Sequence, residues 1–135
     1  MGIKKFCTFR SPFALADLMA CPVQAMKDGM PSPVQMMVGR YSGYTFPVVF
    51  EGKKSCGKRL RDFLNTGYGD YFFLIADRVR DVFEANALTG WKTYPVEVYD
   101  KKGAPVPGYH GISILGKCGP ITYDPATLFH KQYSS

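Results

Sequence analysis

Two short apolar runs in the middle of the chain predict buried strands. Residues 46–51, five apolar residues followed by Glu51, predict a short strand in which Pro47 is typical of a strand start or a sheet edge. Residues 71–75 are a continuous run of five apolar residues, most of them aromatic. A run of that length favours a buried strand, because a buried helix needs about 10 residues or more. We therefore expect both segments to belong to a sheet.

An amphipathic stretch follows the second run and predicts a helix. Asp77 is a favourable N-cap residue, and Gly90 is a typical stop after a last turn. One face of this predicted helix is apolar and is formed by Val79, Val82, Phe83 and Ala87. The acidic residues of the stretch are Asp77, Asp81 and Glu84, interleaved with Arg78 and Arg80. That interleaving favours salt bridges on a solvated face over a pair of catalytic carboxylates.

The segment after the helix predicts a hairpin. Residues 91–99 alternate as one strand, with Tyr94, Val96 and Val98 on one face and Pro95 and Glu97 on the other. Residues 100–103 (Asp-Lys-Lys-Gly) are a strong turn signal. Residues 104–115 return as a second strand, which is interrupted by Pro105, Pro107 and Gly108. We expect the first of these strands to keep one open face.

Local spacing predicts two more short helices. Ser11 followed by Pro12 is a typical helix start and predicts a helix over residues 13–20. Residues 58–65 place Leu60, Phe63 and Leu64 at i, i+3 and i+4, which predicts one or two helical turns.

Strands and helices therefore mix without a regular βαβ order. This order favours an α+β fold with a small, mainly antiparallel sheet and two or three short helices. A chain of 135 residues predicts a single domain over 1–135. Within it, residues 1–45 give no clear assignment, and residues 121–135 show little periodicity and predict a weakly structured tail.

Charge is distributed unevenly along the chain. The formal net charge is +6, and residues 1–69 carry ten lysines or arginines against four acidic residues. Residues 70–135 carry seven of each sign. The excess peaks over residues 53–61, where the five basic residues are Lys53, Lys54, Lys58, Arg59 and Arg61. Such a patch attracts anionic partners: nucleic acid, anionic lipid or an acidic protein.

Composition limits the cellular setting and the cofactor chemistry. No run of about 18 apolar residues is present, and residues 1–10 lack the apolar stretch of a secretion signal, so we expect a cytoplasmic protein without a membrane span. Reduced thiols then follow for Cys7, Cys21, Cys56 and Cys118, although two disulfides remain open. Because the chain has no CxxC pair and only His110 and His130, we predict no metal site and no cofactor.

Residues 52–58 match a phosphate-binding pattern, G-x-x-x-x-G-K, between a predicted strand and a predicted helix. In a P-loop, the Ser or Thr after the lysine binds magnesium. Here that position is Arg59, which cannot ligate a cation. The segment therefore favours a basic loop that binds some anion over a working NTPase.

Nucleophilic catalysis requires a base next to a nucleophile. The available thiols are Cys56 and Cys118, and the candidate base is His110 in the middle of a predicted strand. Nothing in the sequence pairs them, so we expect no enzyme activity and assign no catalytic residue.

The remaining function classes are binding modules. Nucleic-acid binding would combine residues 52–61 with aromatic side chains for stacking, but no standard nucleic-acid-binding motif is present. Protein binding would use residue types that are enriched at interfaces. The open face of the first hairpin strand offers Trp91 and Tyr99 as anchors, unless Trp91 packs on the preceding helix.

Residues 46–120 carry a partial resemblance to a known group. An apolar strand leads into Asp77-Arg78, then come Leu88-Thr89-Gly90 and Tyr94-Pro95-Val96. This order resembles small bacterial proteins grouped with the immunity proteins of polymorphic-toxin systems. Asp62-Phe63-Leu64 is similar to a further segment of that group. The acidic middle residue of the group's helix start is missing here, and its paired CxxCG motifs are reduced to Cys56-Gly57 and Cys118-Gly119.

The resemblance implies neutralisation of a toxin by direct binding, without catalysis. We therefore predict a protein-binding module whose partner is another protein, with an acidic toxin domain as the expected class. Its predicted contact residues are Lys53, Lys54, Lys58, Arg59, Arg61, Trp91 and Tyr99. The alternative is an anion- or nucleic-acid-binding module that uses the basic 52–61 loop.

Overall fold

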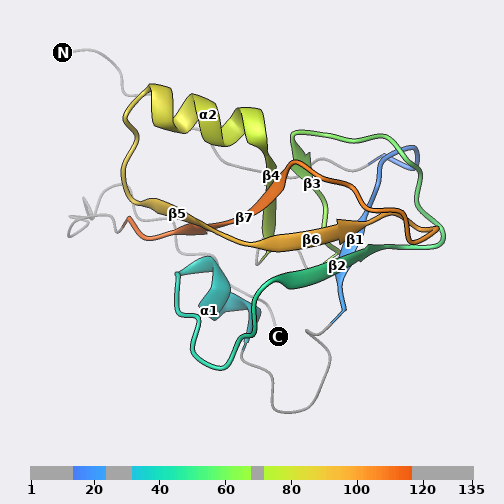
Figure 1. Cartoon of the computed structure of the whole chain (residues 1–135), viewed down its shortest axis with the longest axis horizontal. Coiled ribbons are helices and arrows are strands. Elements are labelled where there is room, and N and C mark those ends of the chain that lie inside the picture. Colours follow the sequence, from blue (N-terminus) through green and yellow to red (C-terminus); the bar gives the residue numbers. More distant parts are fainter. Residues whose placement is uncertain (1–13, 24–31, 68–71, 117–135) are drawn as a thin grey trace, which may run out of the picture.

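The computed structural model describes residues 14–23, 32–67 and 72–116. Seven strands and two helices lie in these residues (Figure 1). The strands are β1 (Ala20–Pro22), β2 (Val48–Gly52), β3 (Phe63–Leu64), β4 (Phe73–Ala76), β5 (Trp91–Tyr94), β6 (Val96–Tyr99) and β7 (Tyr109–Ile114). The helices are α1 (Pro33–Met37) and α2 (Asp77–Ala85).

The strands form two sheets. The four-stranded sheet has the order β3-β4-β7-β5, and all of its neighbours are antiparallel. The three-stranded sheet has the order β1-β2-β6, with β1 antiparallel and β6 parallel to β2. The predicted α+β class with a mainly antiparallel sheet is confirmed.

The chain passes from the four-stranded sheet to the three-stranded sheet at Pro95. The prediction of a single strand over 91–99 is wrong, because β5 pairs with β7 and β6 pairs with β2. Pro95 lies between them and has no N–H to offer to a ladder. After Pro95 the chain still forms the predicted hairpin, since Val106 N–H donates to the carbonyl oxygen of Val98 in β6 at 2.7 Å. The predicted turn also forms, with Gly103 N–H donating to the carbonyl oxygen of Asp100.

The opposite edges of the two sheets meet near β1 and β3. Isolated parallel bridges join Met19 to Asn65 and Asp17 to Arg59. Backbone hydrogen bonds of 2.9 Å support them, from Leu18 N–H to Arg59 O and from Ala20 N–H to Asn65 O. The two sheets are therefore connected at both pairs of edges: through Pro95 between β5 and β6, and by these backbone hydrogen bonds near β1 and β3.

Side-chain alternation divides the apolar residues between two clusters. In β4, Leu74 points into the main core with Phe50 and Leu64, whereas Phe73 and Ile75 point to the other face. That other face carries a smaller cluster covered by α2. Alternation along a strand puts successive side chains on opposite faces, so β4 serves both clusters.

Helix α2 is shorter than the sequence predicts. Asp77 is its first helical residue and Ala76 is the N-cap, so the predicted N-cap at Asp77 is off by one. The helix ends at Ala85, and Gly90, with φ of +81°, instead serves the turn that leads into β5. Of the predicted apolar face, Val79 and Phe83 pack on the sheet, whereas Val82 is 55% exposed and Ala87 lies beyond the end of the helix. No residue of α2 is fully buried.

The other two predicted helices are not formed in the described residues. Residues 14–20 run as a turn and then as extended chain, and residues 58–65 are extended up to β3. Each segment gives its backbone hydrogen bonds to the other, as the bridges above show. Pairing between segments distant in sequence therefore overrides the local spacing of Leu60, Phe63 and Leu64.

Several predictions concern residues outside the described ranges. These are the thiols of Cys7 and Cys118, His130, and the tail over residues 121–135. Among the described residues, no helix has the length and apolar character needed to cross a membrane.

Candidate protein-binding surface

The structure joins the predicted basic loop to a second lysine pair. Gly52, the last residue of β2, lies against the turn that follows β6. A Cβ at Gly52 would stand 2.6 Å from the backbone nitrogen of Lys101 in that turn. Lys101 Nζ donates to the carbonyl oxygen of Cys56 at 3.0 Å. The loop after β2 and the turn after β6 therefore lie side by side.

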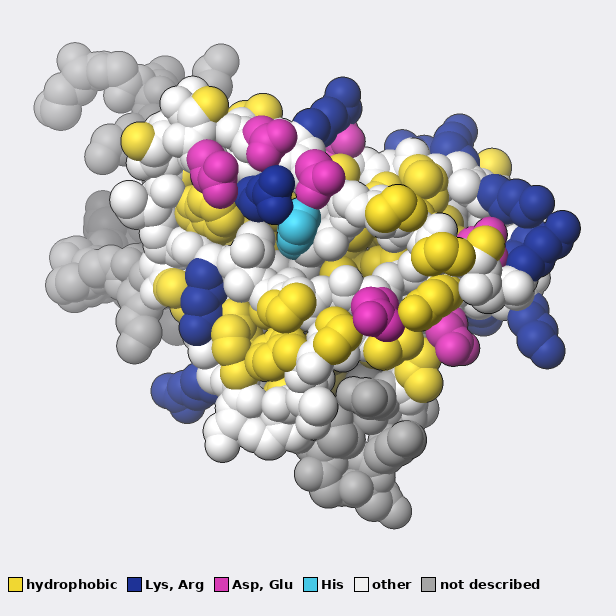
Figure 2. Space-filling model, viewed as in Figure 1, with side chains coloured by type: hydrophobic (Ala, Val, Ile, Leu, Met, Phe, Trp, Pro, Cys, Tyr) yellow, Lys and Arg dark blue, Asp and Glu magenta, His cyan; other side chains and the backbone are white. Residues whose placement is uncertain are grey.

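We call the surface formed by these two segments the basic end; its residues are Lys53, Lys54, Lys58, Lys101 and Lys102. All but Lys101 are exposed. Lys and Arg side chains gather at the right-hand end of the molecule, where the loops after β2 and β6 lie (Figures 1 and 2). The Asp100 carboxylate there accepts the N–H groups of Ala104 and Lys102, and these bonds, with the nearby charge of Lys58, lower its pKa.

Lys101 and Lys102 were not among the predicted contacts, because they belong to the half of the chain that has no net charge. Their only sequence signal is their place in a strong turn. Nothing in that signal says which other loop the turn will approach.

The P-loop-like pattern has a packing explanation. The strand before it is present, but the predicted helix after it is absent. A Cβ at Gly57 would overlap the backbone of Ala16, and Gly52 closely approaches the turn at Lys101. Both glycines are therefore needed where two stretches of backbone meet, which is one of the standard uses of glycine.

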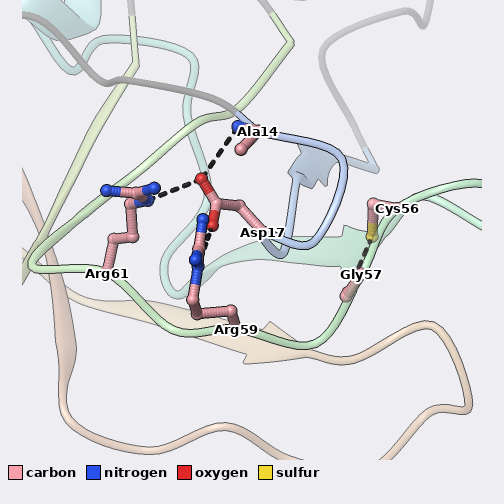
Figure 3. A network of polar contacts seen from close by, with 6 residues as sticks. All are labelled: Ala14, Asp17, Cys56, Gly57, Arg59 and Arg61. Atoms are coloured by element: carbon pink, nitrogen blue, oxygen red, sulfur yellow. Dashed lines mark hydrogen bonds and ion pairs between the residues drawn. The ribbon is translucent and has the colours of Figure 1, made fainter.

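A buried carboxylate holds two of the predicted contact residues (Figure 3). Asp17 is 2% exposed, and its two oxygens accept hydrogen bonds from Arg59 Nε and Arg61 Nε at 2.5 Å each. Ala14 N–H donates to Oδ2 at 2.9 Å. Burial raises the pKa of the Asp17 carboxyl, but the hydrogen bonds from Arg59, Ala14 and Arg61 outweigh it and bring the pKa to about 2. Asp17 therefore stays ionised, and both arginines are fixed at their Nε atoms.

The terminal nitrogens of these arginines remain available. Arg59 and Arg61 keep 53% and 36% of their side-chain surface exposed. Within the described residues, their guanidinium groups have no hydrogen-bond partner other than Asp17. One carboxylate and two guanidinium groups leave a net charge of +1, and each guanidinium keeps terminal N–H donors that do not bond to Asp17.

Three neighbouring hollows that share Phe63 lie along α2 and the four-stranded sheet; we call them together the α2 groove. Its inner part is an apolar cavity of about 130 Å³, lined by Phe63, Phe73, Phe83, Ile112 and Ile114. Its outer part is lined by Leu60, Arg61, Asp62, Phe63, Arg78, Val79, Val82 and Phe83. Leu60 and Val82 are 52% and 55% exposed. Arg61 thus belongs both to the Asp17 cluster and to the outer end of the groove.

An ion pair borders the groove. Arg78 Nε donates to Asp62 Oδ1 at 2.8 Å, and Arg78 Nη2 binds the other oxygen of the same carboxylate. This bidentate bond is the main reason why the pKa of Arg78 is raised. The pair links α2 to the chain just before β3.

Trp91 and Tyr99 take different positions. Trp91 packs edge-on against Phe83 of α2, with ring centroids 5.5 Å apart, and its Nε1 donates to the carbonyl oxygen of Leu88. Tyr99 ends β6 next to the turn of the basic end, and its hydroxyl donates to Glu97 at 2.9 Å, which with the charge of Glu97 raises its pKa. Tyr99 pairs with Glu51 of β2, just before the basic loop, whereas Trp91 belongs to the other sheet.

Among the described residues, His110 meets a carboxylate and an arginine and no thiol. Its Nε2 contacts the Asp77 carboxylate and lies 3.0 Å from Arg80 Nη1. Cys56, one of the two candidate thiols, is buried and donates to the carbonyl oxygen of Gly57 at 3.4 Å. The predicted salt bridging of α2 is present, since Arg80 also pairs with Asp81 at 3.5 Å.

No model of a known protein family matches this chain, and no curated protein matches it either. The class defined by the fold is a small α+β domain. Its described surface offers a basic end, a fixed arginine pair and an apolar groove.

Proposed function

We propose that this chain is a non-catalytic protein-binding module, an immunity protein that neutralises a cognate bacterial toxin by direct binding in the cytoplasm. The observation that carries the proposal is the basic end, where two loops far apart in sequence place five lysines together. An acidic partner is the class that fits this surface.

The lysines act mainly on the rate of association. Exposed charges attract an oppositely charged partner over about 10 Å at moderate salt, which speeds encounter more than it tightens the final complex. None of Lys53, Lys54 and Lys58 is held in a salt bridge with a described residue. Their charges are therefore free to act on a partner.

Stable inhibition needs more than steering. A specific interface buries about 1,200–2,000 Å² in total and has an apolar centre. The apolar lining of the α2 groove supplies such a centre, and its outer end is reached along residues 58–62 from the basic loop. Tyr99 adds an aromatic side chain beside the turn of the basic end.

The second candidate is an anion- or nucleic-acid-binding module. The same lysines favour it, because phosphate contacts use flexible cations without strict geometry. Its signature is an affinity that falls steeply and linearly with salt on a log–log plot. For a partner protein, salt mainly slows association.

The decisive experiment compares two charge reversals that change the net charge equally. Lys54→Glu changes the basic end, whereas Arg40→Glu changes an exposed residue between α1 and β2. Both variants and the parent chain are used to capture partners from the native host, and association rates are measured with the protein retained. We expect Lys54→Glu to slow association several-fold at about 50 mM salt, with the effect largely lost at about 200 mM.

Arg40→Glu should leave the rate nearly unchanged. Failure of the parent chain to retain any specific protein would count against the proposal. Retention of single-stranded DNA that Lys54→Glu abolishes would favour the second candidate instead.

A further inference from the structure

The Asp17 cluster is unusual because one buried carboxylate fixes two arginines and leaves their terminal N–H groups exposed. A free arginine loses rotamer entropy when it is immobilised. Here that cost is met during folding, since Asp17 already holds both Nε atoms at 2.5 Å. Guanidinium N–H pairs match a carboxylate in a bidentate geometry.

Beside this arginine pair lies the apolar part of the α2 groove. The described residues that line its inner cavity of about 130 Å³ are all Phe or Ile. A space of that size suits one large apolar side chain, because an apolar cavity of about 150 Å³ takes up a molecule the size of benzene. Arg61 lines the outer end of the same groove, so cationic and apolar contacts are adjacent.

We propose that Arg59, Arg61 and the α2 groove form one recognition site for an acidic–apolar segment of a partner protein. A carboxylate of that segment binds the terminal N–H groups of the arginines, and a Phe, Leu or Met side chain next to it enters the groove. This site deepens the proposed function, because it names the chemistry of the partner. Charge complementarity chooses the occupant. The arginine cluster and the nearby lysines are cationic, the Asp62 carboxylate at the outer end is already paired with Arg78, and the inner part of the groove is apolar.

A nucleic-acid backbone fits this site less well. It offers phosphates to the arginines but no aliphatic side chain for the inner cavity. The exposed side chains of Leu60 and Val82 at the groove would gain nothing from a sugar–phosphate chain. A protein segment satisfies both parts of the site.

The test uses a random peptide library displayed on phage and panned against the full chain. Peptides of about 12 residues reach roughly 40 Å when extended, enough to cover both parts of the site. We expect enriched peptides to carry Asp or Glu within a few residues of Phe, Leu or Met. Peptides enriched without carboxylates, or without large apolar residues, would overturn the proposal, as would no enrichment at all.

Matched variants then locate the binding of a selected synthetic peptide. Val82→Glu adds a charge inside the groove, and Val34→Glu adds the same charge on α1, at a residue of similar exposure. We expect binding at least tenfold weaker for Val82→Glu, and less than twofold weaker for Val34→Glu. Equal effects of the two variants would refute the groove as the site.

A third variant separates geometry from charge. Arg61→Lys keeps the positive charge but loses the planar pair of N–H donors. We expect about fivefold weaker peptide binding, and an unchanged affinity would exclude the arginine pair. Lys54→Glu serves to distinguish the two proposals: it should alter the association rate of the partner but hardly alter peptide affinity at about 200 mM salt.

Discussion

The aromatic ring of Tyr94 lies directly against the backbone of Gly111. These residues are partners across the β5–β7 ladder, and a Cβ at Gly111 would overlap the ring. Tyr94 is 2% exposed and sits in the main core. The missing side chain at Gly111 of β7 therefore makes the space for the Tyr94 ring of β5.

Replacing Gly111 with alanine should destabilise the fold by about 1–3 kcal/mol, because the core is overpacked and the ring must move. Denaturant unfolding measures the loss. Gly116→Ala is the control, since a Cβ there would meet nothing closer than 3.8 Å. Equal stability of the two variants would show that Tyr94 does not press on Gly111.

Removal of the Tyr94 hydroxyl should have the opposite effect and stabilise the fold. This hydroxyl is buried and has no hydrogen-bond partner among the described residues. An unpaired buried polar group costs about 1–3 kcal/mol. Tyr94→Phe should therefore raise the free energy of unfolding by about 1 kcal/mol.

Tyr41→Phe provides the matched comparison for that hydroxyl. Tyr41 packs edge-on against Tyr94, but its own hydroxyl lies 2.8 Å from Ser113 Oγ. Removing it should lower stability by about 1 kcal/mol. A loss of stability in both variants would mean that the Tyr94 hydroxyl is satisfied in solution.

The low pKa of Asp17 should make the free energy of unfolding depend on pH in the acid range. Its pKa in the folded chain is about 2, below the ordinary value of 3.8. The folded state therefore binds this proton less readily than the unfolded state does. The stabilisation is complete above pH 3.8 and is lost as the pH falls through about 2.

Urea unfolding of the parent chain and of Asp17→Asn between about pH 5 and pH 2 measures this effect. The difference in stability between them should shrink as the pH falls. A difference that stays constant over the whole range would contradict the assignment of the low pKa to Asp17.

Gly57 separates a packing role from a phosphate-binding role. Gly57→Ala should destabilise the chain by at least about 1–3 kcal/mol, because a Cβ would overlap the Ala16 backbone. Lys58→Ala, at the lysine of the same pattern, should stay within about 0.5 kcal/mol, since Lys58 is exposed. Thermal unfolding checks both. A rise in melting temperature on adding a nucleoside triphosphate with magnesium would instead support phosphate binding.

Local sequence patterns correctly predicted the structure where the spacing of apolar residues matches the buried face of a strand or helix. The run over 71–75 gives β4, and the alternation of Tyr94 and Val98 correctly predicts two buried side chains. The face of Val79 and Phe83 is the one that packs on the sheet. In each case the period of the sequence matches the geometry of the element that buries it.

Local patterns failed where the backbone found distant partners. Leu60, Phe63 and Leu64 have helical spacing, yet residues 58–65 are extended because their peptide groups bond to residues 16–20. The role of Asp17 was invisible for the same reason. A single acidic residue in an apolar stretch does not reveal which arginines will meet it.

The amino-acid sequence by itself determined the class of the fold, the central strands, the helix after Ala76 and the strong positive charge of residues 53–61. These depend on side-chain periodicity and composition, which act between neighbours in the chain. Only the tertiary structure decided that Lys101 joins the basic loop, that Asp17 fixes Arg59 and Arg61, and that α2 leaves a groove open. Those features depend on contacts between residues that are distant in the chain, such as Asp17 and Arg59, which are 42 positions apart. No local pattern encodes such contacts.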